Sequence, residues 1–490
     1  MKKIIAILMA LLLLLTSCLT AFAEGPGRST PPDKPSSEMG EPPEGMGNPP
    51  DGMGNPPDGM GTPPDGIGNP PGSMGTPPGG MGTPPGGGSS SFEYSATAEI
   101  TESAVLSGET YTSETSDESA LIINTNENVT LADITVTKTG DSDGGDNCNF
   151  YGLNAALLVM GGSTATITGA TITSDADGAN GVFSYGGNGG RNGAAGDGTT
   201  VYISDSTIVT TGDGSGGIMT TGGGVTYASN LSVETSGRSS AAIRTDRGGG
   251  TVVVDGGSYT SNGLGSPAIY STADITVSNA TLVSNLSEGV CIEGKNSITL
   301  IDCDMTANNT KCNGNATFLD TIMIYQSMSG DADSGSSHFT MTGGSLTSLN
   351  GHMFHVTNTH AVITLSGVEL INEDEENILL SVCDDGWSGA SNIAELNADA
   401  QNLTGTILVG SNSTLTLTLS NGSTYEGAIS GEISNSKGSV VSAEVGSVTV
   451  TLDETSTWTL TADTYISEFN GGLANVNTNG YTLYVNGTAM

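Results

Sequence analysis

Basic side chains are scarce in this sequence. It has 12 Lys and Arg residues against 52 Asp and Glu residues in 490, which gives a formal net charge of −40 at pH 7. Proteins bind nucleic acid or an anionic membrane surface through clustered Lys and Arg. The composition therefore argues against both partners. It is compatible with Ca²⁺, with a cationic partner, or with solubility outside the cell.

Helix-forming stretches and cysteine pairs are also lacking. Beyond the N-terminus no stretch is rich in Leu, Ala, Glu and Lys together, aromatic residues make up 5% of the chain, and Gly occurs 73 times. This favours an all-β chain. Five of the six cysteines follow Ala23, and an odd number is not typical of a disulfide framework. We interpret them as small buried side chains, with one disulfide among Cys291, Cys303 and Cys312 as the alternative.

The first 23 residues are predicted to be a secretory signal. Two lysines precede an apolar run at 4–15, which is too short to span a bilayer comfortably. "AFA" at 21–23 fits ordinary signal peptidase, whereas "LTSC" at 15–18 resembles a bacterial lipobox and would leave a lipid-anchored Cys18. Either cleavage predicts an exported protein, secreted or held at the cell surface. No later apolar run is long enough for a transmembrane helix.

Residues 24–91 are predicted to be a disordered spacer. They repeat Pro-Pro, Gly and Met, as in "NPPDGMGTPPDGIGNPPGSMG". Such a segment cannot bury a core, and its Pro-Pro pairs favour extended polyproline II. A spacer behind an export signal suits a domain that is held away from a surface.

From residue 92 one sequence pattern recurs throughout the chain, as in "ITVSNATL" at 275–282. An apolar anchor is followed two residues later by Asp, Asn or Gly, and five residues later by a second apolar residue. The bend positions are Asp133, Gly169, Asp205, Asn230, Gly256, Asn279, Asp302, Gly343 and Gly367. These residue types tolerate a left-handed backbone best. The sequence pattern therefore predicts two short strands joined by a one-residue bend.

The spacing of this sequence pattern predicts the fold. The nine anchors are 36, 36, 25, 26, 23, 23, 41 and 24 residues apart, and a further short strand recurs in each interval, such as "PAIY" at 267–270 and "IMIY" at 322–325. Periods in the low twenties with strands and no helices are typical of a β-solenoid. We predict an all-β, right-handed parallel β-helix of about a dozen coils over 92–405. C-terminal β coils and a cap are expected to continue it over 406–490.

The Asx-or-Gly bend between short strands at this period resembles right-handed parallel β-helix proteins of the pectin-lyase-like type. The nearest resemblance is to exported β-helix proteins of Gram-positive anaerobic bacteria that are described as adhesin-like or carbohydrate-binding. The resemblance covers roughly residues 100–490. It implies a fold but no single activity, because that fold hosts lyases, hydrolases, esterases, binders and adhesins.

The few basic residues suggest a ligand surface. Alignment of the recurring short strands is expected to place polar and aromatic groups at matching outward positions about 4.8 Å apart on successive coils. The candidate residues are Arg244, Tyr270, Glu293, Tyr325 and His355, with Arg247 and Lys295 beside them. Tyrosine rings stack on sugars, and Arg or Lys pairs with acidic groups. The alternative is an ordinary solvated ladder in which Glu293 compensates Arg244.

An acidic segment is the candidate metal site. "GDSDGGDNCN" at 140–149 contains Asp141, Asp143, Asp146, Asn147 and Asn149. Oxygen ligands at alternate positions with glycines between them suit Ca²⁺. Asp331 and Asp333 form a weaker candidate, and a solvated acidic loop is the alternative. The four histidines are expected to be separated by strand alternation, so no transition-metal site is expected.

Two functional hypotheses follow. One is an exported or surface-displayed β-helix that binds polysaccharide or mediates adhesion without catalysis. The other is a Ca²⁺-dependent polysaccharide lyase or glycoside hydrolase of the pectin-lyase-like fold, for which the Asp pairs of the hydrolases are not visible.

Overall fold

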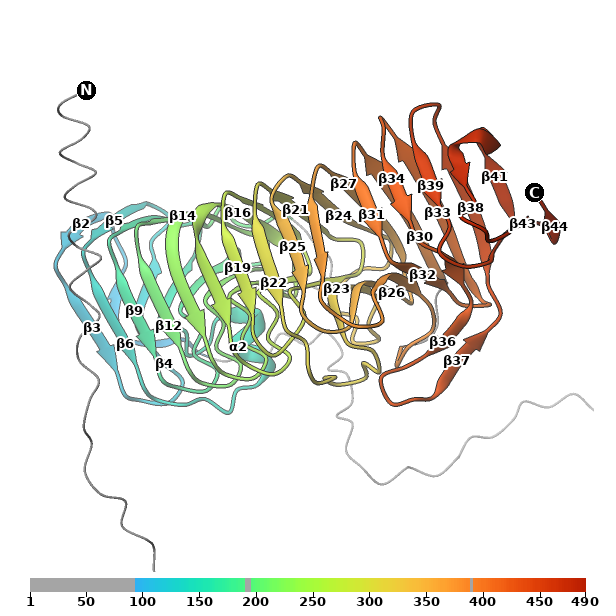
Figure 1. Cartoon of the computed structure of the whole chain (residues 1–490). Helices are drawn as coiled ribbons and strands as arrows, with labels where there is room; N and C mark the ends of the chain where they lie inside the picture. The colour runs from blue at the N-terminus through green and yellow to red at the C-terminus, as the bar shows by residue number, and fades with distance from the viewer. Residues whose placement is uncertain (1–92, 190–194, 388–390) are drawn as a thin grey trace, which may run out of the picture. The chain divides into compact units, whose positions relative to one another are not determined.

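The computed structural model describes residues 93–189, 195–387 and 391–490. The predicted signal at 1–23, Cys18 and the spacer at 24–91 lie outside these residues. The regular secondary structure of the described chain is almost entirely parallel strands, stacked in chain order from β2 to β41 (Figure 1). Helix α2 (Asp146–Tyr151) and the 3₁₀ helix η1 (Leu473–Asn475) are its helices. The predicted all-β solenoid is confirmed.

Each coil contributes one strand to a 13-stranded sheet and, along most of the stack, two strands to a 22-stranded sheet. The 13-stranded sheet contains, in order, β1 (Ser95–Ile100), β4 (Glu118–Asn124), β7 (Leu157–Met160), β10 (Val182–Tyr185), β13 (Ile218–Thr221), β15 (Ile243–Thr245), β17 (Ile269–Ser271), β20 (Val290–Glu293), β23 (Asp320–Tyr325), β26 (His352–Thr357), β29 (Ile378–Val382), β32 (Thr406–Val409) and β35 (Ile429–Ser430).

The 22-stranded sheet forms two rows. The first row contains β2 (Ala104–Ser107), β5 (Asn128–Ala132), β8 (Thr164–Thr168), β11 (Thr200–Ser204), β14 (Gly224–Thr235), β16 (Gly250–Ser261), β18 (Asp274–Ser278), β21 (Ser297–Ile301), β24 (Ser336–Thr342), β27 (His360–Ser366), β30 (Asn392–Asp399), β33 (Ser413–Ser420), β38 (Ser447–Leu452) and β41 (Glu468–Asn470). The second row contains β3 (Thr110–Ser113), β6 (Thr135–Lys138), β9 (Thr171–Ser174), β12 (Thr207–Thr210), β19 (Thr281–Ser284), β22 (Asp304–Ala307), β25 (Ser345–Ser348) and β28 (Glu369–Asn372), and the long strands β14 and β16 run through both rows.

Small sheets complete the described chain toward the C-terminus. One contains β31 (Asn402–Thr404), β34 (Thr424–Glu426), β39 (Thr457–Thr459) and β42 (Val476–Asn477). A second is the antiparallel hairpin β36 (Glu432–Ser434) and β37 (Val440–Ala443), and a third contains β40 (Thr464–Ile466), β43 (Leu483–Val485) and β44 (Thr488–Ala489). Within the described ranges, no helix is both long and apolar enough to cross a membrane.

The one-residue bend lies between the two rows. All nine predicted bend residues have a positive φ, between 50° and 73°: Asp133, Gly169, Asp205, Asn230, Gly256, Asn279, Asp302, Gly343 and Gly367. The bends are also linked from coil to coil. The amide of Asn279 donates to the Ile301 carbonyl at 2.9 Å, and its side-chain Nδ2 donates to Asp255 Oδ1 at 2.7 Å. The predicted bend is confirmed in every coil for which it was made.

Alanine occupies this bend in one later coil. Ala398 pairs in register with the anchor Leu365, and Ala400 two residues later has φ 50°. A side chain with a Cβ is strained there by about 1–2 kcal/mol, whereas glycine is not. We expect Ala400→Gly to raise the free energy of unfolding by about 0.5–1 kcal/mol after the entropic cost of glycine, as measured by denaturant titration. As a control, Ala361→Gly in the buried interior of β27 should lower the free energy of unfolding. If both glycine variants change it equally, the backbone at Ala400 is not strained.

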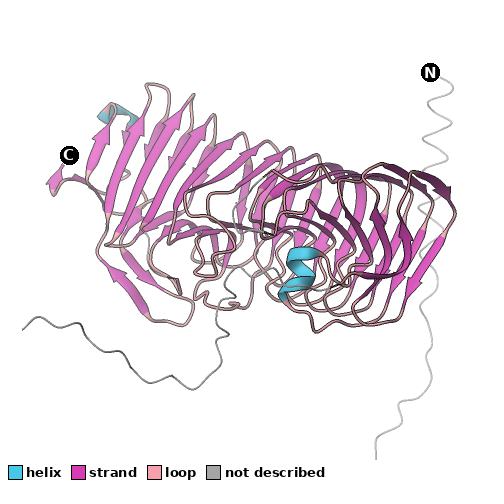
Figure 2. Ribbon diagram, turned by 180° about the vertical axis from the view of Figure 1, so that it is seen from behind, coloured by secondary structure: helices cyan, strands magenta, loops and turns pink. Residues whose placement is uncertain are grey.

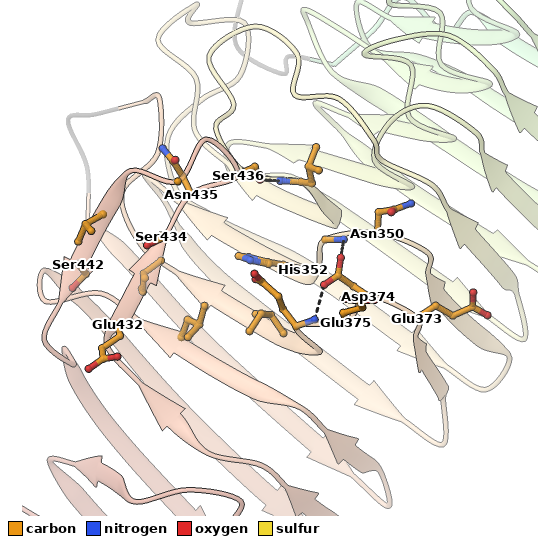
Figure 3. A pocket seen from close by; sticks show the side chains of 18 of the residues that line it. Asn350, His352, Glu373, Asp374, Glu375, Glu432, Ser434, Asn435, Ser436 and Ser442 are labelled. Carbon is orange, nitrogen blue, oxygen red and sulfur yellow. Dashed lines mark hydrogen bonds between the residues drawn. The ribbon is translucent and has the colours of Figure 1, made fainter.

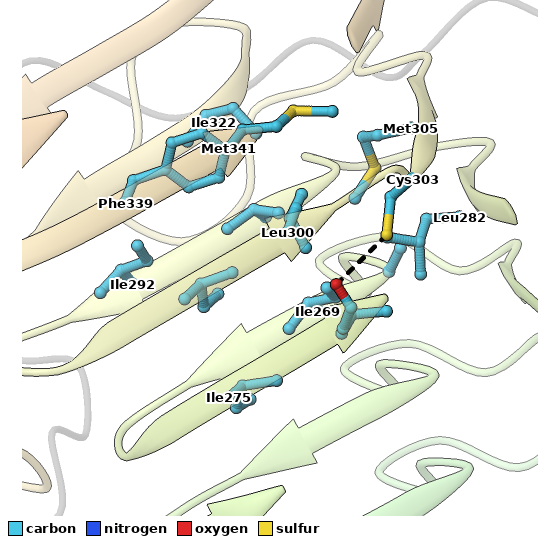
Figure 4. Packing of buried hydrophobic residues seen from close by; sticks show 14 of the residues in the cluster. Ile269, Ile275, Leu282, Ile292, Leu300, Cys303, Met305, Ile322, Phe339 and Met341 are labelled. Carbon is cyan, nitrogen blue, oxygen red and sulfur yellow. Dashed lines mark hydrogen bonds between the residues drawn. The ribbon is translucent and has the colours of Figure 1, made fainter. Parts of the chain in front are cut away.

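The interior consists of apolar ladders that run along the stack. Figure 4 shows one part, in which Leu300 and Met341 pair in register on neighbouring coils and Ile275 belongs to the same core. Cys303 lies among them, and its Sγ donates to the Val277 carbonyl at 3.3 Å. All five described cysteines are free, and four are buried, whereas Cys312 is half-buried. The interpretation as small buried side chains is confirmed for these four, and no disulfide joins the described cysteines.

The outer face of the 13-stranded sheet is covered. Helix α2 lies on the outer side of the strands (Figure 2), where its segment covers a cluster that contains Leu158 and Phe183. Further along, Tyr270, Cys291 and Tyr325 form a second cluster with Trp387. A third cluster joins Phe318 and Leu408 to Ile433 of the hairpin β36–β37. Loops between strands therefore form a second layer on this sheet, and the candidate residues lie beneath or beside it.

Candidate ligand groove on the covered sheet

The predicted stripe is displaced by two residues. Tyr270 pairs with Arg244 as expected, but its partner on the next coil is Cys291, and the ladder continues through Met323 to His355. Glu293 and Tyr325 pair with each other two positions further along their strands. Residues i and i+2 of a strand face the same side, so composition alone did not fix the register. The single five-residue ladder was wrong, and two neighbouring ladders replace it.

The expected solvent exposure of the stripe was also wrong. Glu293, Tyr325 and His355 are buried, and the side chain of Arg244 is 13% exposed. The cations are already paired with carboxylates: Arg244 Nη2 with Asp246 Oδ2 at 2.7 Å, Arg247 Nη2 with Asp331 Oδ1 at 2.5 Å, and Lys295 Nζ with Asp333 Oδ2 at 2.7 Å. An acidic sugar would have to displace these carboxylates, and two of the three sites are largely enclosed.

Glu293 is the centre of a hydroxyl cluster. Tyr270 and Tyr325 donate to its Oε2 at 2.5 and 3.2 Å, while Ser327 and Ser329 donate to Oε1. Burial, followed by the charge of Glu293, raises the pKa of both tyrosines well above the usual range, so both hydroxyls keep their protons. Four donors satisfy the carboxylate without a cation. This arrangement fixes the loop at 327–329 to the sheet, which is a structural role.

Arg244 links this region to the acidic segment. Its Nη1 donates to Asn149 Oδ1 at 3.2 Å, and its guanidinium lies 5.6 Å from the centre of the Tyr270 ring. Burial raises the pKa of Asp246 to about 6 against the opposing effect of Arg244. Asn149 belongs to α2, so the arginine connects the helix to the sheet.

The acidic segment does not form one open loop. Asp146, Asn147 and Asn149 lie on helix α2, and Asp141 Oδ1 accepts the Asp177 amide at 2.9 Å. Asp143 lies before the helix. In the part of the chain that the structure describes, no three His, Cys, Asp or Glu side chains are grouped as a metal site. Calcium binding here stays a prediction.

An open groove lies where the covering layer meets the corners of the coils (Figure 3). Its volume is about 1240 Å³. One wall consists of two corners of consecutive coils, at 349–351 and 373–376, and the other is the hairpin β36–β37. The lining residues are Leu319, Leu349, Asn350, Gly351, His352, Glu373, Asp374, Glu375, Glu376, Ile378, Leu408, Glu432, Ile433, Ser434, Asn435, Ser436, Gly438, Val440, Ser442 and Ala443.

Hydrogen bonds hold both walls in place. On one side, Asp374 accepts the amides of Gly351 at 2.7 Å and Glu376 at 2.9 Å. On the other side, the hairpin residue Ser436 donates its amide to the Thr317 carbonyl at 3.0 Å and accepts the Leu319 amide on its Oγ at 3.1 Å. The groove is therefore fixed to the solenoid from both sides. Glu373, Glu375, Glu376 and Glu432 are exposed along it.

His352 lines the groove from the start of β26 and is 7% exposed. Its Nδ1 lies 2.7 Å from Ser381 Oγ, which is also 2.7 Å from His355 Nδ1. His355 Nε2 lies 3.4 Å from Asp385 Oδ2, and Phe318 stacks on the His355 ring at 4.7 Å. Strand alternation was expected to separate the histidines, but the corner before β26 turns His352 out of the core toward Ser381. Sequence reasoning missed this connected set.

Stability should depend on pH through His352. Burial, assisted by His355, lowers its pKa from 6.5 to about 3 despite the opposing charges of Asp374 and Asp385. Between these two pH values the His352 imidazole is protonated in the unfolded chain but not in the folded chain. The free energy of unfolding is therefore highest above pH 6.5 and decreases as the pH falls toward 3. Between pH 7 and 4.5 this group should cost about 2–3 kcal/mol. Denaturant titrations at both pH values should show a smaller loss for His352→Asn, and an unchanged loss would contradict the assignment.

A separate aromatic surface lies on the 22-stranded sheet. Tyr202 and Tyr227 are exposed on neighbouring coils, and their rings stack at 5.0 Å with 10° between their planes. They line a shallow pocket of about 370 Å³ with Thr166, Val253 and Asp255. Exposed tyrosine rings of this kind contact sugars elsewhere, but this pocket has fewer polar groups than the groove.

No protein-family model, curated protein or solved structure matches this chain. The fold alone does not identify an activity, because one fold supports many unrelated functions. The geometry of the groove is therefore the principal guide to function.

Proposed function

We propose that this protein is an exported β-solenoid that binds polysaccharide in the groove between the corners at 349–351 and 373–376 and the hairpin β36–β37, without cleaving it. The observation that carries this proposal is the mixed lining of an open groove. Hydroxyl, amide and carboxylate groups line it together with Leu319, Ile378 and Leu408. Sugars present hydroxyls and apolar ring faces together, so a binding surface needs both kinds of group.

The groove replaces the basic stripe as the proposed binding surface. Arg244 and Arg247 are largely enclosed and paired with carboxylates. Lys295 is exposed but also paired. Uronic acid polymers, which need free cations, are therefore weaker candidates than neutral or cationic polysaccharides.

Display at the cell surface is part of the proposal. The apolar segment at 4–15 with its "AFA" and "LTSC" sites supports export, and the Pro-Gly repeats at 24–91 support a spacer. The resemblance to pectin-lyase-like adhesins and carbohydrate-binding proteins points in the same direction. Adhesion through a glycan of a host or wall surface would use the same groove.

A polysaccharide lyase or glycoside hydrolase is the second candidate, and one observation favours it. Carboxylates stand on both walls of the groove, with Glu375 on one side and Glu432 on the other. Glycoside hydrolysis uses two carboxyl groups on either side of the bond that breaks. Calcium would be needed in the lyase version of this proposal.

Retention and turnover distinguish the two candidates. The purified chain is incubated with neutral, amine-bearing and uronic acid polysaccharides, with and without Ca²⁺. Retention is then measured together with new reducing or unsaturated ends. We expect retention without new ends, whereas turnover would establish the enzyme.

Ser434→Trp on the groove wall should abolish retention, but Ser439→Trp, on the same hairpin and outside the lining, should not. Retention that survives Ser434→Trp would place binding elsewhere, with the Tyr202–Tyr227 surface next to test.

A further inference from the structure

We propose that the groove selects a polysaccharide with free amino groups, such as a glucosamine polymer, because its polar surface presents hydrogen-bond acceptors and negative charge. This inference rests on the proposed function and names the ligand class. It predicts that the groove binds a glucosamine polymer more tightly than the N-acetylated form of the same polymer.

The charge of the walls is the first observation. Glu373, Glu375 and Glu376 on one wall and Glu432 on the other are exposed, and ionised carboxylates only accept hydrogen bonds. No Lys or Arg is present among the described lining residues. The hairpin does carry Lys437, but this residue is not part of the lining. An ammonium group bound at either wall would therefore lie near carboxylates, with no Lys or Arg among the described lining residues to compete with it.

His352 is the second, independent observation. It is more than nine-tenths buried, its Nδ1 is engaged by Ser381, and the ring lies at the groove (Figure 3). No hydrogen-bond partner of its Nε2 is found among residues 93–189, 195–387 and 391–490. Whether Nε2 offers a proton or a lone pair follows from the groups behind it.

The contacts behind His352 favour one tautomer. Asp385 Oδ1 accepts the amide and hydroxyl of Thr317 at 2.8 and 2.6 Å, which leaves Oδ2 for His355 Nε2 at 3.4 Å. A carboxylate only accepts, so this contact favours a proton on His355 Nε2, and with that tautomer Nδ1 accepts from the Ser381 hydroxyl. Ser381 Oγ then accepts from His352 Nδ1–H. His352 Nε2 is left with a lone pair for the groove.

An amino sugar fits this set of acceptors. An ammonium group donates three hydrogen bonds, and bonds in which both partners are charged are the strongest of their kind. A neighbouring sugar hydroxyl can donate to His352 Nε2. Acetylation removes the charge and two of the three donors and adds an acceptor carbonyl. The acetylated polymer would then lose the groups that the walls recognise.

Calorimetric titration of the full chain tests the inference. The probes are a glucosamine hexamer and the N-acetylglucosamine hexamer. We expect the glucosamine hexamer to bind at least about tenfold more tightly, which is about 1.4 kcal/mol. Glu432→Gln and His352→Asn should each weaken its binding by about five- to twentyfold. Asn places its amide near the Nδ1 position and can keep the Ser381 bond while it removes the acceptor at Nε2.

Matched controls separate the groove from diffuse attraction by an acidic protein. Glu102→Gln, exposed in the first coil, and His360→Asn, on β27 of the other sheet, should leave the affinity unchanged. His352→Gln, whose side-chain oxygen can reach the Nε2 position, should restore part of it. Nitrogen chemical shifts of His352 should also show a proton on Nδ1 and none on Nε2 in the unliganded protein.

The outcomes distinguish this inference from the proposed function. Equal binding of both hexamers through the groove would overturn the amine preference and leave polysaccharide binding intact. Binding of the glucosamine hexamer that is insensitive to Glu432→Gln and His352→Asn, or equally sensitive to Glu102→Gln, would also overturn it. Failure of every tested polysaccharide to bind would overturn the proposed function as well. Glu432 is exposed, so its variant is expected to fold even if His352→Asn does not.

Discussion

Replacement of Trp458 with alanine is expected to lower the free energy of unfolding by about 3–5 kcal/mol. Trp458 on β39 is fully buried, stacks on Tyr425 of the preceding coil at 5.7 Å, and donates its Nε1–H to the Gly427 carbonyl at 3.0 Å. The variant would leave a large cavity and an unpaired carbonyl between the last coils. Denaturant titration followed by circular dichroism measures the loss.

The loss should also be local, because each coil of a solenoid contacts mainly its neighbours. Hydrogen exchange of Trp458→Ala should speed up over residues 406–490 and change little over 93–300. Tyr465→Ala is the control, since Tyr465 is 48% exposed and also stacks on a tyrosine, Tyr484 at 4.5 Å. It should cost less than about 1 kcal/mol. Uniform loss of protection along the chain would contradict the nearest-neighbour description.

Asn279→Val is expected to cost about 2–3 kcal/mol. Asn279 has φ 54°, and a β-branched side chain is strongly disfavoured in that left-handed region. The substitution also removes the hydrogen bond from Nδ2 to Asp255, which links neighbouring bends. Thermal unfolding should show the loss as a clearly lower midpoint.

Two matched variants isolate the backbone effect. Asn279→Gly removes the same side-chain hydrogen bond but accepts the left-handed conformation, so it should cost less than about 1 kcal/mol. Thr281→Val, exposed two residues later in strand β19, should be nearly neutral because valine suits a strand. If Asn279→Val and Asn279→Gly melt together, the strain at the bend is not what stabilises the coil.

The fold could be predicted from the sequence because its determinants are local. The left-handed bend between two strands favours Asn, Gly or Asp, which occupy it in the nine coils where it was predicted, and the strands on either side repeat the same apolar spacing. The period then requires each coil to lie on the previous one. The bend and its two strands lie within one short segment, and the period is their simple recurrence, so single-sequence reasoning could recover both.

The candidate residues could not be placed in the same way. Arg244 and Tyr270 were assigned to one ladder correctly, but Glu293 was assigned two positions away from its true ladder. Both positions face the same side of the strand, so only the length of the corner before it decides the register. Burial was missed because the covering layer comes from loops distant in sequence, such as the segment that carries Trp387.

The groove was missed for a related reason. Its hairpin wall at 432–443 and its corner walls at 349–351 and 373–376 are far apart in sequence, and only the return of the hairpin over the sheet brings Glu432 and Glu375 to the same groove. A weak signal was available, since "INEDEEN" at 371–377 places four acidic residues at one corner. The cluster His352, Ser381, His355 and Asp385 had no comparable signal, because its two histidines and their partners come from two consecutive coils.

A crystal structure of the full chain soaked with a glucosamine hexamer tests the central claim most directly. The account predicts sugar density in the groove between residues 349–351, 373–376 and the hairpin β36–β37, with an amino group beside Glu432 or Glu375 and a sugar donor at His352 Nε2. Density on the Tyr202–Tyr227 surface instead, with the groove empty at saturating hexamer, would contradict it.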